Sequence, residues 1–280
     1  MKLLPPAAYR TLLRAALRED LGRAGDLTTK LFVPSGARFS ARVVSREAGV
    51  ICGLEIAAAA FRACDGRARV RLLARDGARV KAGRTVMTVS GGRGILTAER
   101  TALNFLQRMS GVATLTRRYV DRVRGTRAKI LDTRKTLPGW RALDKYAVAC
   151  GGGVNLRMGL YDAAMVKDNH YLGGRLEEGA LELRRRHPGV PLIVECDTPA
   201  QATRVLALKP DVLLLDNMSP AVLRREIPRL RKLAPRVKLE ISGGVSLDSV
   251  RALARLGPDR ISIGRLTHSA PALDLGLDLP

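Results

Sequence analysis

Aromatic residues are scarce in this chain of 280 residues, where Phe, Trp and Tyr together make up 4% of the sequence. Proteins that bind single-stranded nucleic acid stack successive bases on aromatic side chains, and this chain offers few such platforms. The three histidines are scattered, and the four cysteines contain no C-x-x-C pair. We therefore expect reduced thiols, with neither a disulfide framework nor a zinc site.

Long hydrophobic runs are also missing. No stretch approaches the roughly 18 apolar residues that indicate a membrane span, and the N-terminus, M-K-L-L-P-P, lacks the apolar segment of a secretory signal. The hydrophobic content of 46% is nevertheless ample for a folded core. These features predict a globular cytoplasmic protein with no membrane partner.

Acidic residues are few, because 26 Asp and Glu stand against 49 Lys and Arg, which gives a net charge of +23. Such an excess can indicate nucleic-acid binding, since neutralisation of phosphates dominates that affinity. The basic residues are spread along the whole chain instead of being collected in a tail or one helix, which argues against a specific nucleic-acid partner. A basic nucleic-acid-binding protein is the alternative from a different functional class.

The N-terminal part of the chain mixes helical and strand patterns. Apolar residues at helical spacing between Leu12 and Leu17 predict a helix that ends near Gly22. Further helices are predicted over the alanine-rich residues 55–63 and from Ile95 onward. Strand-like runs separated by glycine-containing turns lie at 39–44, 69–73 and 85–89.

From Lys129 onward, apolar strands alternate with amphipathic helices, which is typical of parallel βα units. We predict strands at 129–131, 164–166, 192–194, 212–215, 238–241 and 260–263, and helices at 176–186, 199–208, 220–233 and 247–256. These units are too few for a complete eightfold barrel, and periodicity leaves an open doubly wound sheet as an alternative.

A polar or glycine residue follows each of these strands, namely Asp132, Lys167, Glu195, Asp216, Ser242 and Gly264. In a barrel the carboxyl ends of the strands converge on one face, so we expect these residues to share a site. Glu195 and Asp216 suit Mg²⁺, which takes carboxylate oxygens together with substrate phosphates. The turn Ser242-Gly243-Gly244, with Gly264 after the next strand, suits a phosphate because backbone N–H groups at a helix start can bind one.

The segment I-L-D-T-R-K-T, residues 130–136, brings Arg134 and Lys135 into one turn after a buried strand. The planar fork of arginine suits carboxylates, and the point charge of lysine suits phosphate oxygens. Together with Arg100, Arg157 and Lys167, this turn concentrates positive charge that is costly unless anions neutralise it. The pattern predicts transfer chemistry between a sugar phosphate and a carboxylated acceptor.

Longer motifs occur in order along nearly the whole chain: E-D-L-G-R-A-G-D-L-T-T (19–29), A-E-R-T-A-L-N-F-L-Q-R-M-S-G (98–111), D-T-R-K-T-L-P-G (132–139), K-Y-A-V-A-C-G-G-G (145–153), G-L-Y-D-A-A-M-V-K-D-N-H (159–170), L-L-D-N-M (214–218), S-G-G-V (242–245) and I-G-R-L-T-H-S (263–269). This ordered set closely resembles the nicotinate-nucleotide pyrophosphorylases, the decarboxylating quinolinate phosphoribosyltransferases. The resemblance implies conversion of quinolinate and phosphoribosyl diphosphate into nicotinate mononucleotide, diphosphate and carbon dioxide in NAD biosynthesis.

The same resemblance implies an α/β fold with an N-terminal α/β sandwich domain, residues 1–108, and an incomplete parallel α/β barrel, residues 109–280. The last ~10 residues are expected to pack back on the N-terminal domain. A homodimer with an active site shared between subunits is also implied, with assembly beyond the dimer left open, and Mg²⁺ is the implied cofactor.

Residue roles follow from the motif match. Arg134, Arg157 and Lys167 are implied to bind the quinolinate carboxylates, with Arg100 reaching the substrate across the dimer interface. Lys135 is implied to meet the diphosphate, while Glu195 and Asp216 hold ribose hydroxyls and Mg²⁺, partly through substrate and water. Ser242, Gly243, Gly244 and Gly264 resemble the 5-phosphate cradle. The implied catalytic residues are Lys135, Lys167, Glu195 and Asp216.

One position departs from the family pattern. The family often has histidine between Asn155 and Arg157, where this chain has Leu156. Leucine cannot donate a hydrogen bond to a carboxylate, so a related phosphoribosyltransferase with a different acidic acceptor is the second hypothesis. Ile193 also replaces the first acid of a pair in the family, but Glu195 aligns with the second, so metal binding is expected to be kept.

Overall fold

The computed structural model describes residues 4–279 and divides into two compact units. Unit 1 contains the chain up to Arg117, residues 136–152 and the chain from Leu266 onward, whereas unit 2 contains residues 118–135 and 153–265. Helix α4 (Gly94–Arg122) begins in unit 1, and its last residues belong to unit 2. Among the described residues, no helix is long and apolar enough to cross a bilayer.

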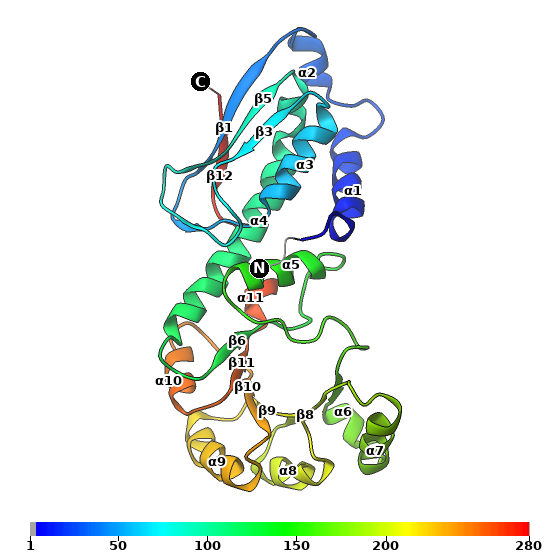
Figure 1. Ribbon diagram of the computed structural model, residues 1–280, viewed down its shortest axis with the longest axis vertical. Helices are drawn as coiled ribbons and strands as arrows, with labels where there is room; N and C mark the ends of the chain where they lie inside the picture. The colour runs from blue at the N-terminus through cyan, green and yellow to red at the C-terminus, as the bar shows by residue number, and fades with distance from the viewer. Residues whose placement is uncertain (1–3, 280) are drawn as a thin grey trace. The chain divides into compact units, whose positions relative to one another are not determined.

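Unit 1 is built on an antiparallel sheet of four strands in the order β12-β1-β5-β3 (Figure 1). Ala41 and Val43 of β1 are buried, and α3 buries Ile56 and Phe61. Because α3 and α4 lie along one face of the sheet in Figure 1, these side chains form the core of an α/β sandwich. The elements are η1 (Pro6–Ala8), α1 (Arg10–Leu21), α2 (Leu27–Phe32), β1 (Phe39–Ser45), β2 (Gly49–Val50), α3 (Leu54–Cys64), β3 (Arg69–Leu72), β4 (Arg79–Val80), β5 (Thr85–Gly91), α5 (Arg141–Cys150), α11 (Arg265–His268) and β12 (Leu275–Asp278).

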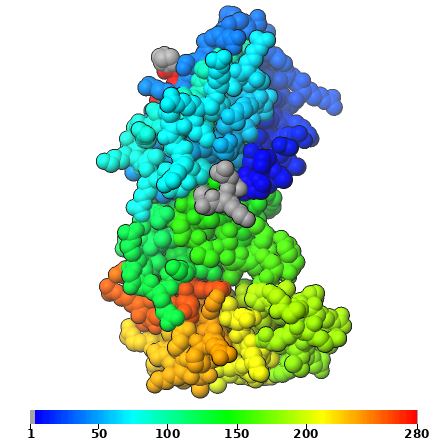
Figure 2. Space-filling view, viewed as in Figure 1, coloured from blue at the N-terminus to red at the C-terminus, as the bar shows by residue number. Residues whose placement is uncertain are grey.

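Unit 2 is a parallel sheet of six strands in the order β6-β11-β10-β9-β8-β7. Helices α8 and α9 follow the outer side of the sheet (Figure 1) and form the yellow and orange surface of this unit in Figure 2. The elements are β6 (Lys129–Leu131), β7 (Ala164–Val166), α6 (Asp168–Tyr171), α7 (Leu176–Arg186), β8 (Leu192–Cys196), α8 (Pro199–Arg204), η2 (Val205–Leu208), β9 (Val212–Asp216), α9 (Pro220–Leu233), β10 (Lys238–Ser242), α10 (Val250–Arg255) and β11 (Arg260–Ser262).

The strand order decides between the two topologies that periodicity left open. Strands β7 to β11 are neighbours in chain order, and β6 completes the curve beside β11. A doubly wound sheet would reverse its order at a switch point, which this sheet does not do. Among the described residues, the far edge of β6 pairs only with Val154, through a bridge from Leu131, and β7 forms the other edge. The predicted α/β sandwich followed by an incomplete parallel barrel is therefore confirmed.

Several boundaries differ from those expected from sequence. Strands β8, β9 and β10 run one or two residues further, so that Glu195, Asp216 and Ser242 lie inside the strands instead of after them. Helix α10 starts later than expected, at Val250, because Ser246 and Ser249 hydrogen-bond each other's backbone N–H groups in a turn, at 3.0 and 3.2 Å. Helix α5 was not predicted.

Candidate active site

A cavity of about 300 Å³ opens at the carboxyl ends of the unit 2 strands, and we name it the upper cavity. Alternate residues of a strand face the same side, so β9 presents Leu214 and Asp216 together, and register places Ser242 of β10 beside Asp216. The cavity gathers most of the predicted site residues. Its lining is Thr133, Arg134, Lys135, Leu156, Arg157, Met165, Lys167, Glu195, Leu214, Asp216, Ser242 and Ser262.

Asp132 positions the loop that carries Arg157. This carboxyl group is fully buried, and its Oδ1 accepts a hydrogen bond from the backbone N–H of Leu156 at 2.9 Å. The backbone of Val154 also donates to Ile130 O at 2.8 Å, so residues 154–156 run alongside β6. The aspartate that precedes the Arg134 turn therefore fixes the position of the next loop instead of lining the cavity.

Two guanidinium groups lie close enough to repel each other. Burial, followed by the positive charge of Arg134, lowers the pKa of Arg157. Arg157 Nη1 donates to the carbonyl of Ala163 at 3.0 Å, whereas its buried Nε has no hydrogen-bond partner among the described residues. Like charges in a partly desolvated site are costly without a counter-ion, so this end of the cavity suits an anion.

The lining of the upper cavity also contains two carboxylates, those of Glu195 and Asp216. Lys167 Nζ donates to Glu195 Oε2, and Asn217 Nδ2 donates to Asp216 Oδ2 at 2.6 Å. The second oxygen of each carboxylate makes no hydrogen bond with the residues that the structure describes. Two carboxylates with open oxygens match Mg²⁺, which needs only one or two protein carboxylates when substrate phosphates and water complete its coordination.

The glycine turn after β10 requires glycine for steric reasons. Gly243 has φ +93°, and a Cβ there would lie 2.1 Å from Asn217 Oδ1. Gly244 also has a left-handed backbone, with φ +58°. Ser242 lines the upper cavity, whereas Gly243, Gly244 and Gly264 are not among its lining residues.

Arg100 is a predicted site residue that lines a cavity in the other unit. It lies on α4 in unit 1, where it lines a different cavity of about 410 Å³ with Asp20 and Trp140. Its exposed side chain makes no hydrogen bond or ion pair with any described residue. The upper cavity is lined by unit 2 alone.

Sequence reasoning missed four lining residues, namely Thr133, Met165, Leu214 and Ser262. Alternation along each strand was the available signal, since Leu214 precedes Asp216 by two residues and Met165 precedes Lys167 by two. Ser262 matters because it donates a hydrogen bond to the fully buried Glu240. Burial, partly offset by Ser262 and Arg260, raises the pKa of Glu240.

One further group of metal-ligating side chains occurs in the described part of the chain, formed by Cys52, Asp76 and Cys150 in unit 1. The two sulfur atoms are 3.4 Å apart. Asp76 Oδ1 already accepts the backbone N–H groups of Gly53 and Leu54, and its Oδ2 accepts the Tyr146 hydroxyl at 2.9 Å. These bonds give the aspartate a structural role at the start of α3.

The fold and the site together define an α/β-barrel enzyme whose substrates carry several negative charges. Models of the quinolinate phosphoribosyl transferase N-terminal and C-terminal domains match residues 26–110 and 112–278. The chain is 47% identical over 281 residues to a nicotinate-nucleotide pyrophosphorylase (carboxylating) of Mycobacterium leprae, with 97% of each chain covered. It therefore belongs to the quinolinate phosphoribosyl transferase family.

Solved structures agree with this assignment. The nicotinate-nucleotide pyrophosphorylase from Francisella tularensis superposes with a TM-score of 0.92 at 35% identity, covering 100% of this chain and 98% of that one. The corresponding protein from Ehrlichia chaffeensis gives a TM-score of 0.92 at 35% identity, with 100% of both chains covered.

Proposed function

We propose that this chain is a pentosyltransferase that moves the phosphoribosyl group of phosphoribosyl diphosphate onto quinolinate, with loss of carbon dioxide, in NAD biosynthesis. The products are nicotinate mononucleotide and diphosphate. The observation that carries the proposal is the upper cavity, which combines Arg134 and Arg157 with Glu195 and Asp216 in one lining. A dicarboxylate and a sugar diphosphate are together complementary to that charge pattern.

In this proposal Arg134, Arg157 and Lys167 bind the two carboxylates of quinolinate. The repulsion between the two guanidinium groups supports it, because a bound dicarboxylate would neutralise both. The buried Nε of Arg157 would also gain an acceptor. Lys167, held by Glu195, would lie between the carboxylate-binding and ribose-binding sides.

The chemistry needs positioning and charge compensation more than a covalent nucleophile. The lone pair of the pyridine nitrogen forms a bond to C1 of the ribose while the bond from C1 to the diphosphate oxygen breaks. Lys135, exposed at the edge of the upper cavity, would offset charge on the leaving diphosphate. The ring nitrogen is then cationic, so it stabilises the electron pair left at C2 when carbon dioxide departs. A proton from water then binds that electron pair and takes the place of the lost carboxylate at C2.

Glu195 and Asp216 would hold the ribose hydroxyls and Mg²⁺, partly through substrate and water. Within the described residues, no third metal-ligating side chain joins them, which matches the preference of Mg²⁺ for substrate phosphates and retained water. The ion, when bound, supplies charge neutralisation at the diphosphate. Ser242, Gly243, Gly244 and Gly264 would bind the 5-phosphate, supported by the left-handed turn at Gly243 and Gly244.

We also propose a homodimer in which Arg100 completes the site of the partner subunit. Arg100 is exposed and without a partner among the described residues. Large apolar side chains are exposed on unit 2, with Leu160, Tyr161 and Leu172 at 73%, 76% and 89%. Exposed apolar groups of this kind are typical of surfaces that a partner covers.

Complementation between inactive variants tests the shared site. Arg100→Ala and Lys135→Ala should each leave at most about 1% of wild-type turnover, whereas their co-expressed mixture should recover about a quarter of wild-type activity, because half of random dimers carry one intact site. A mixture that stays inactive while the variants exchange subunits would refute the shared site. Size-exclusion chromatography of each variant should give the same dimer as the wild type.

The activity itself is tested by incubating the protein with quinolinate, phosphoribosyl diphosphate and Mg²⁺ and measuring release of carbon dioxide from the 2-carboxylate. No release under conditions in which a verified family member works would end the proposal. A cytoplasmic location is proposed as well, supported by the four cysteines, none of which forms a disulfide among the described residues, although Cys52 and Cys150 lie close together.

Leu156 favours a second candidate, a related phosphoribosyltransferase for a different pyridine carboxylic acid. Its side chain lines the upper cavity beside Arg157 and offers no hydrogen bond to a carboxylate. Turnover should be compared among quinolinate, nicotinate and other pyridine carboxylates. Faster turnover of an acid other than quinolinate would favour the second candidate.

A further inference from the structure

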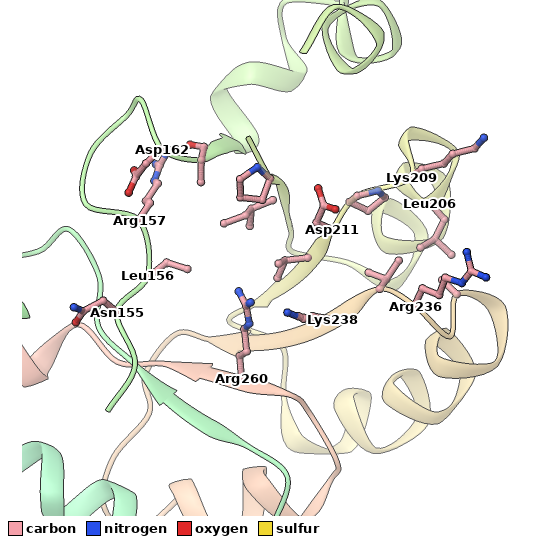
Figure 3. A pocket seen from close by; sticks show the side chains of 17 residues that line it. Asn155, Leu156, Arg157, Asp162, Leu206, Lys209, Asp211, Arg236, Lys238 and Arg260 are labelled. Atoms are coloured by element: carbon pink, nitrogen blue, oxygen red, sulfur yellow. Dashed lines mark hydrogen bonds between the residues drawn. The ribbon is translucent and has the colours of Figure 1, made fainter. Parts of the chain in front are cut away.

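A second and larger cavity, of about 790 Å³, occupies the opposite end of the same barrel, and we name it the lower cavity (Figure 3). Its strand residues come from the amino ends of the strands, since Lys238 and Arg260 are the first residues of β10 and β11 and Val212 is the first residue of β9. The upper cavity takes its residues from the carboxyl ends. Both cavities lie within unit 2.

An apolar layer separates the two cavities. The buried side chains of Ala163, Ile193, Val212 and Leu214 form one cluster, against which Leu156 and Met165 pack. Leu214 and Met165 line the upper cavity, whereas Ala163, Ile193 and Val212 line the lower one. Only Leu156 and Arg157 appear in both linings. The lower cavity is therefore a compartment of its own that contacts the proposed active site through two residues.

Positive charge dominates the lower cavity. Its lining contains two acids, which keep their charge: Asp162 accepts the backbone N–H groups of Met158 and Gly159, at 2.7 and 3.0 Å, and Asp211 accepts that of Leu192 at 2.8 Å. Five basic residues outnumber these acids in the same lining and are labelled in Figure 3: Arg157, Lys209, Arg236, Lys238 and Arg260.

Most of this charge is not balanced by the protein. The side chains of Lys209, Arg236 and Lys238 make no hydrogen bond or ion pair with any residue that the structure describes. Arg260 forms a long ion pair with Glu240, at 3.7 Å, and burial raises the pKa of that carboxyl group. Cations that converge on a concave surface create a field that attracts anions.

We propose that the lower cavity binds a small molecule with two or more phosphate groups, of the size of a nucleotide. The mixture of lysine and arginine suits phosphate oxygens, and the volume lies within the range of small-molecule sites. Leu206, Pro210 and Val237 add apolar surface beside the cations, where a nucleotide base can pack. A dicarboxylate would leave much of this volume empty.

The shared lining predicts a functional consequence. Arg157 borders both cavities, so a phosphate in the lower cavity and quinolinate in the upper one draw on the same guanidinium group. Occupation of the lower cavity should therefore raise KM for quinolinate. This consequence rests on the proposed function, whereas binding itself does not.

Titration calorimetry with ATP and with inorganic diphosphate tests the proposal. The double variant Arg236→Ala and Lys238→Ala removes two cations of the lower cavity, and Arg225→Ala with Lys232→Ala is the matched control, because both of its residues are exposed on α9 outside the lining. We expect ATP to bind the wild type and the control equally, and the cavity variant at least about tenfold more weakly. Diphosphate should also bind the wild type and the control equally and the cavity variant more weakly. Its affinity should be lower than that of ATP, since diphosphate lacks the base.

Kinetics supply the second readout. Without added nucleotide, the cavity variant should release carbon dioxide at the wild-type rate, so failure of this site is distinguishable from failure of the proposed reaction. With ATP present, KM for quinolinate should rise in the wild type and in the control but not in the cavity variant. If both double variants lose ATP binding equally, ATP binding depends on overall charge and the proposal is overturned. Binding of duplex DNA without binding of ATP would also overturn it.

Discussion

Replacement of Arg157 by methionine tests whether this residue serves substrate binding at a cost to the fold. Methionine keeps a long apolar stem and removes the charge. The variant loses one structural hydrogen bond, from Nη1 to Ala163 O, worth about 1 kcal/mol. The variant gains stability because it removes the buried Nε, whose lack of a partner among the described residues costs the wild type roughly 1–3 kcal/mol of unfolding free energy. Repulsion from Arg134 also disappears. We expect a free energy of unfolding within about 1 kcal/mol of the wild type, or above it.

Quinolinate binding should respond very differently. Loss of a charge-assisted hydrogen bond costs about 1.5–3 kcal/mol, which weakens binding about ten- to hundredfold. Quinolinate at about one hundred times its wild-type Kd should stabilise the wild type by about 2.7 kcal/mol. The same concentration should stabilise Arg157→Met by less than about 1 kcal/mol if its Kd is about thirtyfold weaker.

Urea unfolding with and without quinolinate measures both quantities, and calorimetry gives Kd directly. Arg231→Met is the matched control, since Arg231 bonds to Asp259 at 2.8 Å and to two backbone carbonyls outside the upper cavity. The control should lose about 2 kcal/mol of stability and keep wild-type quinolinate affinity. The reasoning fails if Arg157→Met unfolds as easily as the control while quinolinate still stabilises it fully.

Three shorter predictions follow from neighbouring contacts. Lys135→Ala should lower kcat about hundredfold with unchanged Kd for quinolinate, measured by carbon dioxide release and calorimetry; an unchanged kcat would remove Lys135 from the diphosphate site. Leu156→His should lower KM for quinolinate about tenfold, whereas the control Leu156→Met should leave that KM unchanged. A KM that is unaltered in both variants would contradict a hydrogen-bond donor role at this position. Burial acts to raise the pKa of Asp259, but the Leu239 N–H and the Arg231 and Arg127 guanidinium groups outweigh burial and lower that pKa. The carboxylate therefore stabilises the fold at pH values above its unfolded pKa of about 3.9, and this stabilisation is lost as pH falls through the lower folded pKa. Asp259→Asn should therefore lose about 2 kcal/mol at pH 7 and progressively less as pH falls below about 3.9 in urea unfolding, and a loss that stays constant with falling pH would contradict the assignment.

Much of the secondary structure was predictable because buried strands are short apolar runs. Strand β6 (Lys129–Leu131) and helices α7 and α9 occur where hydrophobic periodicity placed them. Strand order was not predictable, since periodicity records which face of an element is buried and not which strand lies beside it. The resemblance to a family supplied that information, and the parallel pairing of β6 with β11 places the first strand of unit 2 beside its last.

The candidate site was predictable where chemistry and position coincided. Glu195 and Asp216 stood out as acids at the ends of apolar runs, and the structure places both in the upper cavity. Lys238 and Arg260 carried no such signal, because a cation at the start of a strand in a chain with 49 Lys and Arg is ordinary. The lower cavity emerges only in the folded sheet, where Arg260 pairs with Glu240 of β10, Lys238 pairs with Val212 of β9, and both cations line one cavity with Arg157.

The position of Leu156 gives the family departure a structural meaning. Its backbone N–H is held by Asp132, so the substitution leaves the loop anchored and Arg157 directed to the anion-binding end. Its side chain packs on the apolar layer that separates the two cavities. A histidine there would bring a polar group to that layer, whereas leucine extends it. Under the proposed function, recognition of the acid therefore rests on Arg134, Arg157 and Lys167, while the Leu156 side chain adds to the apolar layer between the two cavities.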